Sequence, residues 1–121
     1  LARAKRAGHL PPKMRFLGAQ MLAYLTDGLW LELARRANAS AASLAKLFEA
    51  AGFAPVHPVD GNEVFVRLDA PAARSLQSAG VGFHDWSDGS QRFVCSWATR
   101  DWEIDQVGAA LAASSSARPA P

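Results

Sequence analysis

Residues 27–52 read DGLWLELARRANASAASLAKLFEAAG, and this stretch decides the fold. Its apolar residues recur at the spacing of one helix face, which is the strongest periodic pattern in the chain. That face consists of Trp30, Leu33, Ala34, Ala37, Ala41, Leu44 and Phe48. Asp27 suits the N-cap of a helix, and Gly52 suits the position just past a helix end. The pattern therefore predicts a long amphipathic helix over 27–50.

The sequence on either side of this helix completes the prediction of fold class. Helical spacing of apolar residues also predicts a helix over 13–25. After Gly52 the apolar period changes to two, which is typical of strands. The predicted elements are strands at 64–68, 81–86 and 91–97, a helix at 70–79, and a last helix that Thr99 caps. Long helices followed by a small sheet predict an α+β fold, with a mostly antiparallel sheet and helices on one of its faces.

Composition sets limits on the class of protein. The chain has 121 residues, of which 50% are hydrophobic and 20% charged, which is typical of one globular domain. The sequence contains no long apolar run that is free of charge, so it predicts no membrane span. The single cysteine, Cys95, excludes an internal disulfide and fits a reducing compartment, so we expect a cytoplasmic protein. The three histidines and Cys95 are too widely spaced for a zinc motif, and we expect no metal.

Charge is unevenly distributed along the chain. Residues 1–20 contain five basic residues and no acidic one, whereas the other residues contain eight basic and eleven acidic ones. The five are Arg3, Lys5, Arg6, Lys13 and Arg15. A basic end on an acidic body suggests an anionic partner such as a phosphate, a nucleic acid or an acidic protein surface. Because Phe16 is the only ring-stacking aromatic in this end, we do not expect nucleic-acid binding.

Arg92 is the most informative candidate for a binding role. It opens an apolar strand, where its planar guanidinium could bind a carboxylate through two hydrogen bonds. Spacing alone favours the other interpretation, an exposed arginine at a sheet edge. Lys13 and Arg15 flank a predicted helix start and could bind an anion there, or form a solvated basic turn.

Other reactive residue types favour structural roles. Cys95 lies among apolar residues of a strand, which is typical of a buried and inert thiol. The acids Asp101, Glu103 and Asp105 fit the favourable first turn of a helix. His84 and Asp85 are adjacent on a strand and so point to opposite faces. The residues alone thus give a globular α+β domain without a self-sufficient catalytic set.

Several segments together resemble a known family. They are KRAGHL at 5–10, KMRFLGAQ at 13–20, LAYLTDGLW at 22–30, LARRAN at 33–38, NEVFV at 62–66 and RFVCSW at 92–97. In this order they resemble the C-terminal part of low-specificity L-threonine aldolases. These are pyridoxal-phosphate enzymes of the β-eliminating lyase group, with the aspartate aminotransferase fold. The resemblance covers nearly all of the chain.

The resemblance implies a domain organisation and a cofactor. Residues 1–26 would be the end of the large domain with its linking helices, residues 27–111 the small C-terminal domain, and residues 112–121 a flexible tail. Pyridoxal 5'-phosphate would be bound mainly by an upstream domain that carries the Schiff-base lysine, because Lys5, Lys13 and Lys46 do not match that position. The family also implies a homo-oligomer, a dimer or a tetramer.

The resemblance further implies an activity and a role for three residues. The complete enzyme would cleave L-threonine or L-allo-threonine to glycine and acetaldehyde. Arg92 matches the arginine that grips the substrate's α-carboxylate, and Lys13 with Arg15 would lie near the cofactor phosphate. We expect the 121-residue chain alone to be inactive. The alternative is a non-catalytic fragment or anion-binding module that lacks the Schiff-base lysine.

Overall fold

The computed structural model describes residues 2–9 and 12–116, which belong to two compact units, Leu1–Glu32 and Leu33–Pro121. Helix α3 (Leu29–Ala50) begins in the first unit and continues in the second. It has 22 residues and confirms the long helix that the apolar spacing predicts. No described helix is both long enough and apolar enough to cross a membrane.

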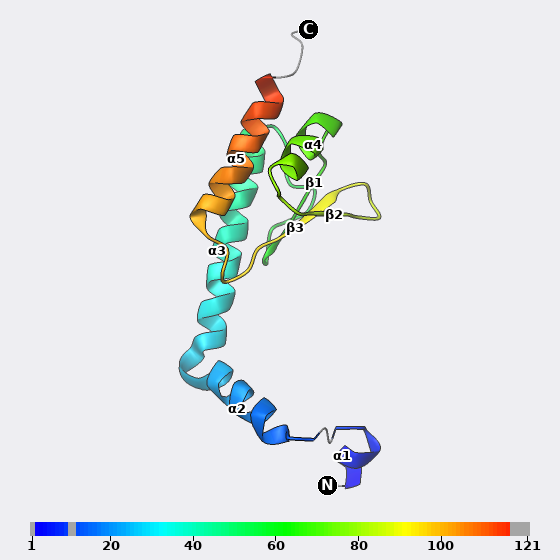
Figure 1. Ribbon diagram of the computed structural model, residues 1–121, viewed down its shortest axis with the longest axis vertical. Helices are drawn as coiled ribbons and strands as arrows, with labels where there is room; N and C mark the ends of the chain where they lie inside the picture. The colour runs from blue at the N-terminus through cyan, green and yellow to red at the C-terminus, as the bar shows by residue number, and fades with distance from the viewer. Residues whose placement is uncertain (1, 10–11, 117–121) are drawn as a thin grey trace. The chain divides into compact units, whose positions relative to one another are not determined.

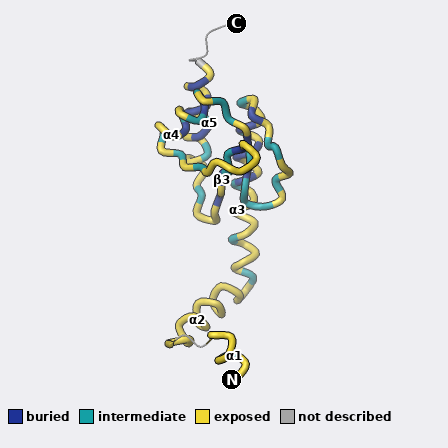
Figure 2. Tube along the Cα trace, turned by 90° about the vertical axis from the view of Figure 1, so that its right-hand side faces the viewer, coloured by how far each residue is buried: buried dark blue, intermediate teal, exposed yellow. Residues whose placement is uncertain are grey.

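The first unit is helical and buries none of its described helix residues. It contains α1 (Ala2–Arg6), α2 (Met14–Leu25), the short 3₁₀ helix η1 (Thr26–Gly28) and the start of α3. Figure 2 shows α2 exposed throughout, and neither α1 nor α2 contains a buried residue. The apolar residues whose spacing predicts this helix are therefore exposed on the surface of α2.

The predicted N-cap at Asp27 is wrong. Asp27 lies inside η1 with a φ of 52°, and the next residue, Gly28, has a φ of 73°. An N-cap has extended backbone, whereas aspartate and glycine are the residues that best tolerate this left-handed conformation. Asp27 and Gly28 therefore make the turn between α2 and α3. The Thr26 hydroxyl supports the end of α2 by donating to the Leu22 carbonyl at 2.6 Å.

The second unit contains the hydrophobic core. The buried face of α3 runs from Ala37 through Ala41 and Leu44 to Phe48, whereas Trp30 at the start of the predicted face is 42% exposed. This face packs with residues of every other element in the unit except the short strand β2 (His84–Asp85). Buried members of the core include Phe48, Val64, Val66, Leu76, Phe93 and Leu111. Figure 2 shows the buried residues gathered in this unit.

The sheet has three antiparallel strands in the order β1-β3-β2. Strand β1 (Glu63–Val66) pairs with β3 (Gln91–Val94), and β2 pairs with the other side of β3. Two helices complete the unit in Figure 1, α4 (Ala70–Ser78) and α5 (Asp101–Ser116). Because Val64, Val66 and Phe93 all enter the core with the helices, the helices cover one face of the sheet. The predicted α+β class is confirmed.

Strands β1 and β3 end earlier than their apolar patterns predict, and side chains bond to the backbone just beyond these ends. Beyond β1, the Leu68 N–H donates to the Gln91 Oε1 at 3.0 Å instead of to a ladder carbonyl. Beyond β3, the Cys95 carbonyl accepts from the Asn62 side chain at 2.7 Å. The Cys95 N–H also donates to the Asn62 carbonyl at 2.8 Å, so one backbone bond continues the pairing just beyond this end of the β1–β3 ladder.

Helix α5 differs from the prediction at both ends. Its start is not capped by Thr99, whose hydroxyl accepts instead from the Ser96 N–H at 2.9 Å. Arg100 precedes the helix, and its N–H donates to the Glu103 carboxylate at 2.7 Å. At the other end the helix continues to Ser116, into the predicted tail of 112–121, because Leu111 and Ser114 are buried and alanine favours helix. Residues 117–121 lie outside the described residues.

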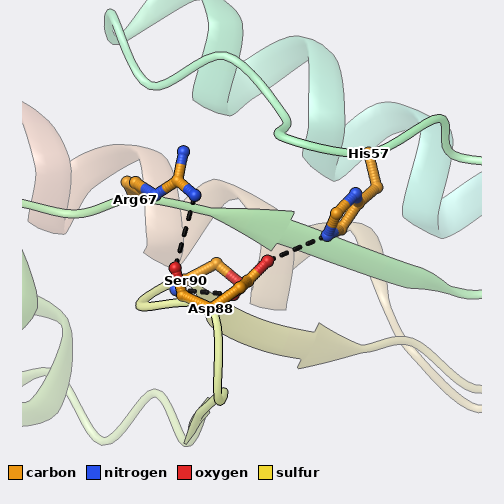
Figure 3. A network of polar contacts seen from close by, with 4 residues as sticks. All are labelled: His57, Arg67, Asp88 and Ser90. Atoms are coloured by element: carbon orange, nitrogen blue, oxygen red, sulfur yellow. Dashed lines mark hydrogen bonds and ion pairs between the residues drawn. The ribbon is translucent and has the colours of Figure 1, made fainter.

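A polar network fixes the turn between β2 and β3 (Figure 3). The Asp88 Oδ1 accepts from the Ser90 N–H at 2.9 Å and from the Ser90 hydroxyl at 2.6 Å. The Asp88 Oδ2 lies 3.0 Å from the His57 Nε2, and the Arg67 Nη2 donates to the Asp88 carbonyl at 3.3 Å. Gly89, with a φ of 81°, provides the left-handed residue of this turn. The turn is thus tied to both segments that flank β1.

The hydrogen bonds from Ser90, followed by the contact with His57, lower the pKa of Asp88 from 3.8 to about 2. A carboxyl whose pKa is lowered by folding stabilises the fold above its ordinary pKa, and this contribution is lost as the pH falls through the folded-state pKa. We therefore expect Asp88→Asn to be less stable than the unchanged chain near neutral pH. The difference should shrink between about pH 4 and about pH 2.

Urea unfolding of both proteins at a series of pH values measures this difference. Asp60→Asn is the matched control, because it removes the same charge from an exposed loop residue. A stability difference between Asp88→Asn and the unchanged chain that does not vary below about pH 4 would contradict the assignment.

Candidate functional site

Arg92 lies on the face of the sheet opposite the core. In the β1–β3 register Val64 pairs with Phe93, and Phe65 pairs with Arg92. Since neighbouring residues of a strand point to opposite faces, the burial of Val64 and Phe93 places Arg92 on the other side with Phe65 and Glu63. We call this side, which carries Glu63, Phe65 and Arg92, the outer face. The guanidinium is therefore available for binding instead of being part of the core.

The Arg92 side chain is held by two residues of the outer face. Its Nη1 donates to the Glu63 Oε1 at 3.3 Å, and its guanidinium carbon lies 4.9 Å from the centre of the Trp86 ring. The Arg92 side chain is 26% exposed, and that of Glu63 is 41% exposed. The Nε of Arg92 is buried and has no hydrogen-bond partner among the residues that the structure describes. The guanidinium is thus oriented, yet its donors are only partly used.

A row of rings extends from Arg92 across the outer face. The Trp86 ring meets Phe65 edge to face at 5.7 Å, and Phe65 meets the His57 ring in the same manner at 5.4 Å. His57 in turn contacts Asp88 of the β2–β3 turn. Edge-to-face ring pairs and cation–π contacts stabilise one relative orientation of their members. The row therefore fixes Trp86, and Trp86 fixes the plane of the guanidinium.

Lys13 and Arg15 belong to the first unit, and both side chains are exposed. Lys13 precedes α2 with a left-handed φ of 62° and no side-chain cap. The Arg15 guanidinium lies 4.9 Å from the centre of the Phe16 ring. Two exposed cations at a helix start do not by themselves enclose a phosphate, so their role in cofactor binding stays a prediction.

Cys95 has the buried, structural role that its sequence context indicates. Cys95 is 3% exposed, and burial is the main cause that raises the pKa of its thiol, with the charge of Glu103 second. Such a thiol is a poor nucleophile. Among the described residues, no three of the types His, Cys, Asp and Glu are grouped to hold a metal ion.

Sequence reasoning missed Glu63 and Trp86 as partners of Arg92. They lie 29 and 6 positions from Arg92 in the chain, and only the strand register and the turn bring them to it. The period-two pattern of 63–66 does place Glu63 on the side of β1 away from the core. The pattern therefore predicts on which face of the sheet Glu63 lies, but it does not predict that Arg92 is its partner.

Comparison with curated proteins finds two relatives that have the same description. No protein-family model matches the chain. The low-specificity L-threonine aldolase of a Pseudomonas species is 38% identical over 117 residues, which are 95% of this chain and 34% of that enzyme. The low-specificity L-threonine aldolase of Pseudomonas aeruginosa is 41% identical over 107 residues, 87% of this chain and 30% of that enzyme.

The fold agrees with these relatives. The structure of Leishmania major threonine aldolase matches 91% of this chain with a TM-score of 0.80 and 28% identity, and the match covers 33% of that enzyme. The chain therefore spans about a third of the length of the relatives that it matches. Over most of its own length, the chain is homologous to one region of the low-specificity L-threonine aldolases.

Proposed function

We propose that this chain is the C-terminal portion of a pyridoxal-phosphate-dependent threonine aldolase, a lyase that cleaves L-threonine or L-allo-threonine to glycine and acetaldehyde. The observation that carries the proposal is Arg92, an oriented and only partly bonded guanidinium on the outer face of a domain homologous to these enzymes. In this proposal Arg92 binds the α-carboxylate of the amino-acid substrate.

The chemistry gives Arg92 a defined task. Cleavage of a β-hydroxy amino acid breaks its Cα–Cβ bond, and the rate depends on holding that bond in one orientation. A carboxylate bound at two points cannot rotate, and this fixes the rest of the substrate. The planar guanidinium offers two parallel N–H donors, whereas a lysine ammonium offers charge without that geometry. Arg92 is thus proposed as a substrate-binding group.

The described residues do not by themselves fit the cofactor. A Schiff-base lysine is activated by removal from water, whereas Lys5, Lys13 and Lys46 are all exposed. We therefore derive no catalytic step through pyridoxal phosphate from this chain. The proposal assigns cofactor binding mainly to a domain outside these residues, with residues 1–26 linking to it and residues 27–111 forming the small domain. A reducing, cytoplasmic location accords with the free Cys95 thiol.

Replacing Arg92 by lysine tests the proposed binding role. We place the chain in a chimera in which residues 1–121 substitute for the matching region of the Pseudomonas aeruginosa enzyme. Arg92→Lys should lower kcat/KM for L-threonine about 100-fold, because one bidentate, charge-assisted contact is lost. Acetaldehyde release measures the activity, and visible absorbance of bound cofactor serves as the control. Unchanged activity with intact cofactor binding would refute the carboxylate role.

The chain alone should bind no pyridoxal phosphate at a stoichiometric ratio, because its lysines are solvated. Titration of the purified chain, followed by visible absorbance and by release of acetaldehyde from L-threonine, measures this. Stoichiometric binding without activity would favour the alternative of an anion-binding module. In that case Lys13→Gln and Arg15→Gln should weaken the binding, because both cations lie in the basic segment.

Exposed apolar residues of the first unit lead us to propose that the protein is a homo-oligomer. The large hydrophobic residues exposed there include Met14, Phe16, Leu17, Met21, Leu22, Tyr24, Leu25, Trp30 and Leu31. A surface of this composition favours burial against another protein surface.

Sedimentation of the chain should therefore show association that increases with concentration. Leu22 is 69% exposed, and Leu22→Glu should weaken the association. Gln20→Glu introduces the same charge on the same helix without removing apolar surface, and should have a smaller effect. A monomer at every concentration would contradict the proposal.

A further inference from the structure

We propose that Glu63 is a specificity-determining residue, which neutralises Arg92 and disfavours ligands that carry a second carboxylate. The inference rests on the proposed function, because it takes Arg92 to be the carboxylate-binding group. It goes further in assigning a second residue of the outer face, Glu63, which discriminates between ligands by their number of carboxylates.

The geometry of the Glu63–Arg92 pair carries the first step. Glu63 and Arg92 occupy strands β1 and β3 on the same face, and the Glu63 Oε1 engages only the Nη1 of the guanidinium, at 3.3 Å. The contact is long and single, and both side chains are partly exposed. Such a pair is weak, so a ligand can share the guanidinium with Glu63 instead of being excluded by it.

The unused donors of Arg92 carry the second step. Its Nε is buried without a partner in the described part of the chain, and Nη1 makes one contact, with Glu63. Because Nε is buried, a ligand reaches the guanidinium through Nη1 and Nη2, and these two nitrogens offer a carboxylate a two-point donor edge that Glu63 occupies only at Nη1. Trp86 packs on the guanidinium at 4.9 Å and keeps its plane fixed, so this donor edge is held in one orientation. The guanidinium of Arg92 therefore retains enough unused N–H donors to bind one carboxylate.

The charges carry the third step. One carboxylate of Glu63 and one guanidinium of Arg92 together have no net charge. A monocarboxylate can still bind through the directed hydrogen bonds. A second carboxylate on the ligand gains little from Arg92 and is repelled by Glu63, and the repulsion acts over several ångströms at a half-exposed site. Glu63 therefore selects by charge, whereas Arg92 binds.

The experiment measures binding of two simple probes, acetate and malonate, to the full chain. The readout is the Arg92 Nε–H signal in a ¹H–¹⁵N spectrum, assigned by its loss in Arg92→Lys. Burial of Nε protects this proton from exchange with water. We expect the unchanged chain to bind acetate at least as well as malonate, at equal ionic strength.

Glu63→Gln should then strengthen acetate binding about threefold and malonate binding about tenfold, because the repulsion scales with the ligand charge. Glu63→Asp keeps the charge and should retain the preference of the unchanged chain. Glu49→Gln, at an exposed position of α3, is the matched control and should change neither affinity.

Two outcomes separate this inference from the function on which it rests. If neither probe shifts the Arg92 signal in any variant, Arg92 does not bind carboxylates, and the proposed binding role fails together with the inference. If both probes bind but Glu63→Gln leaves the ratio of their affinities unchanged, the inference alone is overturned. An increased malonate preference in Glu63→Gln, absent in Glu49→Gln, supports it.

Discussion

The register between β1 and β3 is the constraint on which the rest of this structure depends. It pairs Val64 with Phe93 on the core side and Phe65 with Arg92 on the outer face. A shift by one residue would turn Arg92 into the core and Phe93 out of it, at the cost of burying an unpaired charge. The register is anchored at its two ends by Asn62 on the Cys95 carbonyl and by Gln91 on the Leu68 N–H. The alternation of apolar and polar residues thus sets the side of the sheet on which Arg92 lies, and these two contacts support the same register.

The outer face is organised by rings and polar contacts instead of by burial. Trp86 precedes a turn whose shape is set by Asp88, Ser90 and Gly89, and this turn brings the indole to Arg92. Each ring pair contributes about 1 kcal/mol, so no single contact dominates. What the row provides is orientation: the guanidinium is held in one plane before any ligand arrives, which reduces the entropy that binding must overcome. A proposed carboxylate site on a thin sheet depends on this preorganisation.

The two units differ in how their helices are stabilised. Helices α3, α4 and α5 bury residues in one shared core, whereas α2 buries none of its own. A short helix gains most of its stability in water from packing of its apolar face. Helix α2 thus has the features of a surface that another copy covers, which accords with the proposed oligomer. The structural match over a third of a threonine aldolase concerns the fold of this region, and the proposed activity belongs to the complete enzyme.

The sequence by itself determined the long helix, the α+β class and the burial of Cys95, because helix and strand periodicities and residue hydrophobicity are local properties. It did not determine the helix ends at Asp27 and Thr99. There, backbone conformation and competing hydrogen bonds decide, and these depend on how the neighbouring segments meet. Only the tertiary structure brought Glu63 and Trp86 to Arg92, through strand register and turn geometry. A side chain's face can be read from period two, but its partner on that face depends on how separate segments pair in space.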